Sequence, residues 1–238
     1  MTGMEVQIAV AKVNKYAVSE SGDSLEVVER PNGGISVVLA DGQTSGRGAK
    51  AVSLMVVRKV IGLLAEGVRD GAAARAASDA LFTEKHGKVS CTLNIASIDL
   101  VTNTIVLTRN NPAPMAICRS GNVDMVTAES VPLGTARDTR PIVTEINMEA
   151  GVIVVLYTDG LVHAGERRGA RMETGTIIQS MLDEGEDPAP QEIADELLAH
   201  AVSLDDGRPA DDISVVVLKV TSRVGDQARR MTVRLPIE

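Results

Sequence analysis

Apolar positions along this 238-residue chain change their spacing in an orderly way from one segment to the next. Two early runs, 6–13 and 35–39, are short and rich in β-branched residues, which is typical of strands. Over 49–66 the apolar residues recur at helical spacing, and Gly67 follows as a C-cap. An alanine-rich stretch over 71–85 predicts a second helix. The first third of the chain therefore predicts two strands followed by two helices.

The middle and the end of the chain continue with more strands and a second pair of helices. Strands are predicted over 90–98, 104–108, 114–118, 123–126, 142–146, 152–157 and 213–220, several of them separated by short polar turns. Helices are predicted over 172–182 and 190–202. This order indicates a layered α/β (α+β) fold in which helices flank two packed, mainly antiparallel sheets.

No internal repeat or low-complexity linker divides the chain, so we expect one domain over 1–221. Residues 222–238 form a C-terminal tail that contains Arg229, Arg230 and Arg234 and a strand-like stretch over 231–237. This stretch would pair with a sheet edge or dock a partner, and its role stays open.

The composition of the chain narrows the classes of partner that it is expected to bind. Aromatic residues make up 1% of the chain, so the core is aliphatic and base stacking is not expected. The net charge of -8 argues against nucleic acid and anionic membranes as partners.

Cys91 and Cys118 lie in apolar segments without CxxC spacing, and we interpret both as reduced core residues. With no signal-peptide layout and no membrane-length apolar run, we expect a cytoplasmic protein.

Four aspartates mark the candidate chemistry. Asp23, Asp41, Asp159 and Asp211 belong to short acidic segments, and the last three each stand at the boundary of an apolar strand. Taken singly, an Asp-Gly pair such as Asp41-Gly42 is more often only a turn. Taken together, carboxylates at strand ends of one domain would converge and collect hard divalent cations such as Mg²⁺.

The order of five motifs resembles the metal-dependent protein phosphatases of the phosphatase 2C (PPM) type, in their short bacterial form. The similarity covers roughly residues 4 to 220. The motifs are Ser-Gly-Asp-Ser at Ser21–Ser24, the glycine-containing signature at Ala40–Ala51, Val-Pro-Leu-Gly at Val131–Gly134, the Thr-Asp-Gly strand end at Val155–Leu161, and Asp-Asp-Ile-Ser at the start of Asp211–Leu218. The domain over 1–221 is thus identified as a PPM-type phosphatase domain.

The resemblance implies a β-sandwich flanked by helices and a centre of two Mn²⁺ or Mg²⁺ ions. It implies that Asp41 bridges both ions, that the Gly42 carbonyl completes one of them, and that Asp159 and Asp211 hold the other. Asp23 would lie beside the centre, as a ligand or through water. Asp41, Asp159 and Asp211 would then act in catalysis through a metal-activated water that attacks a phosphoserine or phosphothreonine.

Two departures from the family pattern concern the leaving group and a turn. Larger members carry a histidine directly after the Asp-Gly pair, where this chain has Gln43, so the proton donor is unassigned. The usual Gly-His-x-Pro turn is replaced by 110–114, which we interpret as structural.

Within the family, the chain looks most like the stand-alone regulators of bacterial stress signalling, especially the stressosome phosphatase RsbX. The resemblance implies phosphorylated STAS-domain stressosome proteins as substrates and partners, and removal of their phosphate resets the signal. One alternative substrate is a phosphorylated anti-sigma-factor antagonist, which is also a STAS protein. Another alternative is a catalytically silent phosphoprotein-binding module.

Overall fold

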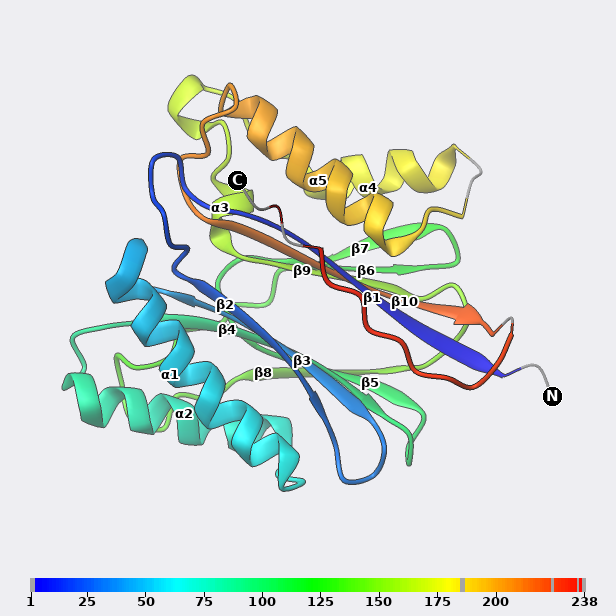
Figure 1. Ribbon diagram of the computed structural model, residues 1–238, viewed down its shortest axis with the longest axis horizontal. Coiled ribbons are helices and arrows are strands. Elements are labelled where there is room, and N and C mark those ends of the chain that lie inside the picture. The colour runs from blue at the N-terminus through cyan, green and yellow to red at the C-terminus, as the bar shows by residue number, and fades with distance from the viewer. Residues whose placement is uncertain (1–2, 185–186, 224, 235, 237–238) are drawn as a thin grey trace.

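A computed structural model describes residues 3–184, 187–223, 225–234 and 236. Over these residues, ten strands form two five-stranded antiparallel sheets that pack face to face, and helices cover the outer face of each sheet (Figure 1). The predicted fold class, two packed antiparallel sheets flanked by helices, is confirmed. No helix in the described part of the chain is both long and apolar enough to cross a membrane.

The first sheet has the strand order β1-β10-β9-β6-β7. Its strands are β1 (Met4–Val13), β10 (Ile213–Ser222), β9 (Ile153–Tyr157), β6 (Met115–Arg119) and β7 (Asn122–Val126). The second sheet has the order β2-β3-β4-β5-β8. Its strands are β2 (Asp23–Glu29), β3 (Ile35–Gly42), β4 (Cys91–Asp99), β5 (Thr104–Asn110) and β8 (Ile142–Asn147).

Helices α1 (Gly46–Ala65) and α2 (Asp70–Lys85) pack on the second sheet, and α4 (Thr174–Asp183) and α5 (Pro190–Leu204) pack on the first (Figure 1). A short helix, α3 (Asp159–Val162), follows β9, and a 3₁₀ turn (Glu166–Arg168) comes after it. The four main helices were predicted from sequence, and their observed ends differ from the prediction by a few residues.

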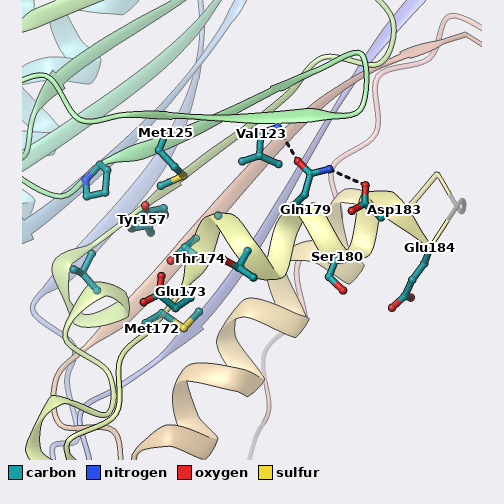
Figure 2. Close-up of a pocket in the computed structure, with 14 residues that line it drawn as sticks. Val123, Met125, Tyr157, Met172, Glu173, Thr174, Gln179, Ser180, Asp183 and Glu184 are labelled. Atoms are coloured by element: carbon teal, nitrogen blue, oxygen red, sulfur yellow. Dashed lines mark hydrogen bonds between the residues drawn. The ribbon is translucent and has the colours of Figure 1, made fainter.

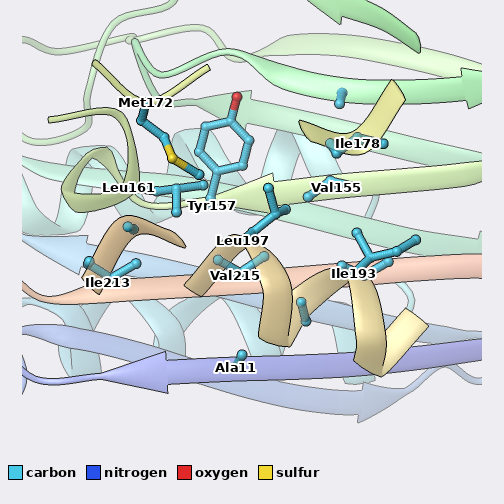
Figure 3. Packing of buried hydrophobic residues seen from close by; sticks show 14 of the residues in the cluster. Ala11, Val155, Tyr157, Leu161, Met172, Ile178, Ile193, Leu197, Ile213 and Val215 are labelled. Carbon is cyan, nitrogen blue, oxygen red and sulfur yellow. The ribbon is translucent and has the colours of Figure 1, made fainter. Parts of the chain in front are cut away.

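Three apolar clusters fill the layers. One cluster lies between the two sheets, one under α1 and α2, and one under α4 and α5. In the last of these, Leu197 of α5 packs with Val215 and Tyr157 of the first sheet (Figure 3). In strand β1, successive side chains point to opposite faces of the first sheet. Val10 packs against the cluster between the sheets, whereas Ala11 belongs to the cluster under α5. Both faces of this edge strand thus contribute to burial.

Strand β2 was not predicted from the sequence. It is an edge strand with Glu26 and Glu29 exposed, so it lacks the continuous apolar run that reveals β3 and β10. The tail also differs from expectation, because residues 231–234 and 236 carry no strand, while 235 and 237 lie outside the described residues. Arg229 holds the tail on the β2–β3 turn by donating hydrogen bonds to Glu29 and to the Gly33 carbonyl.

Candidate metal centre

Asp23 and Asp41 are direct neighbours across β2 and β3. The antiparallel register pairs Asp23 with Asp41, and Asp23 is fully buried. Like charges placed directly opposite each other on a sheet are destabilising unless something offsets them. The strand that the sequence did not reveal is therefore the strand that brings the first two candidate residues together.

Asp159 joins this pair from the other sheet. It is the first residue of α3, directly after β9 and Thr158. Burial, together with the neighbouring carboxylates of Asp23 and Asp159, raises the pKa of Asp41 to about 10. Three carboxyl groups from two different sheets thus share one end of the sandwich.

Asp211 extends the cluster toward solvent. It precedes β10, and its side chain is about half exposed. Burial raises its pKa, and Asp159 adds to the increase, although the Asp212 amide and Lys15 oppose it. The Lys15 Nζ lies 4.0 Å from the Asp211 carboxylate. The structure therefore brings all four predicted aspartates to the same end of the fold.

Position 42 has room only for glycine, because the backbone of Ala49 lies close to it. A Cβ at this position would lie 2.1 Å from the carbonyl oxygen of Ala49, near the start of α1. Gly160 is constrained in the same way, because its Cβ would lie 2.0 Å from the carbonyl oxygen of Asp212. Each Asp-Gly pair of the cluster thus requires glycine because a side chain would collide with the neighbouring backbone.

The Asp23 side chain joins the two sheets. Its Oδ2 accepts hydrogen bonds from Ser214 Oγ of β10 at 2.6 Å and from Thr158 Oγ1, directly after β9, at 3.1 Å. Its Oδ1 has no hydrogen-bond partner among the described residues. A buried carboxylate oxygen without a partner is costly, and the arrangement leaves this oxygen available to a cation or to a water held by one.

Asp212 has a different role from Asp211. Its two carboxylate oxygens accept hydrogen bonds from the backbone amides of Lys15 at 2.9 Å and Gly22 at 2.8 Å. It therefore fastens the loop between β1 and β2, which leads into Asp23, to the start of β10.

The residues at the two departures from the family pattern, Gln43 and the turn over 110–114, form hydrogen bonds that connect loops to strands. Gln43 accepts a hydrogen bond from the Ser90 amide, which joins the β3–α1 loop to the start of β4. Asn111 donates to the Tyr157 carbonyl at 3.0 Å and accepts from the Ala113 amide, so the turn it belongs to supports the end of β9.

Sequence reasoning missed the polar residues that surround the aspartates: Lys12, Lys50, Thr158 and Ser214. Lys12 and Lys50 each donate to the Asp23 carbonyl oxygen at 2.7 Å. The signal for Lys12 was present, because it continues the series Val6, Ile8, Val10 that faces the inter-sheet core. A charged residue at the end of that apolar series marks the mouth of the sandwich.

A hard cation fits this set of donors. The donors are carboxylate and carbonyl oxygens, and like-charged carboxyl groups are crowded together with one oxygen unpartnered. In the described ranges, no group of three or more His, Cys, Asp or Glu residues could hold a metal ion by itself. A cation bound here would therefore also use backbone oxygens and water, as Mg²⁺ commonly does.

A separate hollow of about 790 Å³ lies between β7 and α4 (Figure 2). Met125 and Tyr157 line it from the sheet, and Thr174 and Gln179 line it from the helix. None of the four aspartates borders it, so it is distinct from the cluster.

A family model described as stage II sporulation protein E (SpoIIE) matches residues 31–221. The stage II sporulation protein E of Priestia megaterium is 25% identical over 215 residues, which cover 90% of this chain and 36% of that relative. The chain thus spans little more than a third of the relative's length.

Solved structures share the fold at low identity. The PP2C phosphatase domain of SpoIIE from Bacillus subtilis, with a fragment of its regulatory domain, has a TM-score of 0.79 at 23% identity and covers 93% of this chain and 65% of that one. PstP with two manganese ions gives 0.70 at 19%, covering 92% and 100%. RsbX with magnesium gives 0.68 at 18%, covering 93% and 100%.

These likenesses confirm the resemblance to the PPM phosphatases at the level of the fold. The match over residues 31–221 covers most of the chain and includes Asp41, Asp159 and Asp211. This chain belongs to the stage II sporulation protein E (SpoIIE) family.

Proposed function

We propose that this chain is a metal-dependent serine/threonine protein phosphatase. The observation that carries the proposal is the convergence of Asp23, Asp41, Asp159 and Asp211 at one end of a PP2C-type sandwich. Burial and the neighbouring carboxylates hold the pKa of Asp41 far above its usual range, which a bound cation would reverse. The family match and the metal-containing relatives support this assignment.

In this proposal the chain holds two Mn²⁺ or Mg²⁺ ions. Asp41 and the Gly42 carbonyl would hold one ion, Asp41 would also serve the second ion together with Asp159 and Asp211, and Asp23 would contribute as a ligand or through water. The ions would supply Lewis acidity and lower the pKa of a bound water near the phosphorus. In this proposal Asp41, Asp159 and Asp211 are the catalytic residues, because they hold the metal ions that activate the water.

The surrounding residues keep this set in place. Thr158 and Ser214 fix one oxygen of Asp23, and its other oxygen has no hydrogen-bond partner among the described residues. Asp212 fixes the loop that precedes Asp23. Because both sheets contribute, separation of the sheets at this end would disperse the ligands.

We propose phosphorylated STAS-domain proteins as the substrates and the cytoplasm as the place of action. The likeness to RsbX and the match to the SpoIIE family support a PP2C-type phosphatase. The two candidate substrates, a stressosome component and a phosphorylated anti-sigma-factor antagonist, follow from the resemblance in the sequence motifs. Both candidates present a phosphoserine or phosphothreonine on the same kind of domain, so one active site serves either.

The test is hydrolysis of para-nitrophenyl phosphate, followed by phosphorylated STAS proteins of both kinds, with Mn²⁺, Mg²⁺ or EDTA. We expect activity that requires a divalent metal and that is lost in Asp41→Ala and Asp159→Ala, while Asp124→Ala, an exposed residue of β7, keeps it. No hydrolysis with either metal would contradict the proposal and favour a silent phosphoprotein-binding module.

A further inference from the structure

Two lysines meet at the side of the aspartate cluster, between β1 and α1. Lys12 is on β1, and its register partner in β10 is Ser214, which donates to Asp23. Lys50 is in the first turns of α1. Both Nζ atoms donate to one acceptor, the backbone carbonyl oxygen of Asp23, at 2.7 Å each. The two ammonium groups are therefore no farther apart than the sum of these two distances.

These lysines are not simple salt-bridge partners of the cluster. Among the described residues, neither Lys12 nor Lys50 has a carboxylate within the 4.0 Å of an ion pair. Lysines that served only to neutralise Asp23 would contact its carboxylate, yet that carboxylate is held by hydroxyl groups and the lysines contact the backbone.

The pair also has unused hydrogen-bonding capacity. An ammonium group carries three N–H donors. In the described part of the chain, each Nζ makes one hydrogen bond, to the Asp23 carbonyl. Because both Nζ atoms lie 2.7 Å from the same oxygen atom, the two cations are close enough to repel each other. A group with two negative charges and several oxygens would satisfy both ammonium groups and remove that repulsion.

We propose that Lys12 and Lys50 form an oxyanion site that takes the phosphoryl group of the substrate and holds it beside the aspartates. This assignment rests on the proposed phosphatase function. A phosphate monoester has two negative charges and three terminal oxygens, which match two ammonium groups with free donors. The carboxylates of Asp23, Asp41 and Asp212 also face Lys12 and disfavour an anion, so we expect phosphate to bind more tightly when a divalent metal is present.

The experiment compares Lys12→Met, Lys50→Met and the control Lys59→Met, which changes an exposed lysine of the same helix α1. Substrate is para-nitrophenyl phosphate with Mn²⁺, and inorganic phosphate is the competing inhibitor. Because a charged hydrogen bond to the phosphoryl group acts in the ground state and the transition state alike, we expect KM and the phosphate Ki to rise roughly 10–100-fold in each test variant. The kcat should change far less, Lys59→Met should match the unmodified protein, and Lys12→Arg and Lys50→Arg should restore much of the affinity.

Folded Lys12→Met and Lys50→Met proteins that keep KM and Ki unchanged would overturn the proposal. If the unmodified protein hydrolyses nothing, the phosphatase function fails, but calorimetric titration with inorganic phosphate and Mg²⁺ still tests the site. Binding that is lost in both lysine variants and kept in Lys59→Met would support the pair. Equal phosphate binding in all variants, or no binding to the unmodified protein, would overturn it.

Discussion

Replacing Asp41 by Asn should stabilise the metal-free protein while abolishing its proposed activity. Burial and the carboxylates of Asp23 and Asp159 raise the pKa of Asp41 from 3.8 to about 10. The folded state therefore binds this proton more tightly than the unfolded chain does, and the contribution of Asp41 to stability falls as the pH rises from about 4 toward 10. Asparagine keeps the shape of the side chain, carries no charge, and can donate a hydrogen bond to the neighbouring carboxylates.

The magnitude follows from the pKa shift. One pKa unit corresponds to about 1.4 kcal/mol, so keeping Asp41 protonated at pH 7 costs the folded state up to about 4 kcal/mol. Because the three carboxyl groups titrate together, we assign about half of this, roughly 2 kcal/mol, to Asp41. For a domain of this size, that gain raises Tm by about 4–8 °C.

The assay is thermal unfolding of both proteins in EDTA between pH 5 and pH 8. The advantage of Asp41→Asn should grow with pH, because the unmodified protein loses stability as the pH rises. Asp124→Asn, which removes one exposed negative charge from β7, should leave Tm nearly unchanged. An Asp41→Asn protein that is no more stable than the unmodified protein at pH 7 or 8 would refute the reasoning.

Two further substitutions test the supports of the cluster, and a third tests an ion pair at the opposite end of β2. Gly42→Ala places a methyl group 2.1 Å from the Ala49 carbonyl oxygen, so chemical denaturation should show a loss of about 3 kcal/mol or more, and a loss below 1 kcal/mol would contradict it. Asp212→Ala leaves the buried Gly22 amide and the part-buried Lys15 amide without an acceptor, and urea titration should show about 2–4 kcal/mol lost. Asp70→Ala breaks a buried pair with Arg30, whose Nη1 donates at 2.9 Å, and should lower stability by about 3–5 kcal/mol in calorimetry; an unchanged Tm would argue against this network.

The strands and helices with strong apolar patterns could be predicted from the sequence, because each buries a wide face and that face needs regularly spaced apolar residues. Strand β10 is continuous and apolar because both of its faces are covered, and α1 repeats its apolar residues toward the second sheet. Strand β2 was not predictable in the same way, because an edge strand with exposed Glu26 and Glu29 needs its partner β3 to be recognised.

The sequence indicated which aspartates belong to the candidate site, but it could not show how they are arranged relative to one another. The contact between Asp23 and Asp41 depends on the register of β2 on β3, which no local pattern specifies. The convergence of Lys12 and Lys50 on the Asp23 carbonyl depends on three segments from both layers, so it emerges only from the fold. The ligand roles of Asp23, Asp41, Gly42, Asp159 and Asp211 remain predictions.

The most direct test of the central claim is anomalous diffraction from crystals of the chain grown with Mn²⁺. The account predicts two manganese peaks about 3.5–4 Å apart at the end of the sandwich, with Asp41 touching both and with Asp159 and Asp211 touching one. Peaks that lie away from these residues, or no peak at saturating Mn²⁺, would contradict the claim that the aspartates form a metal centre.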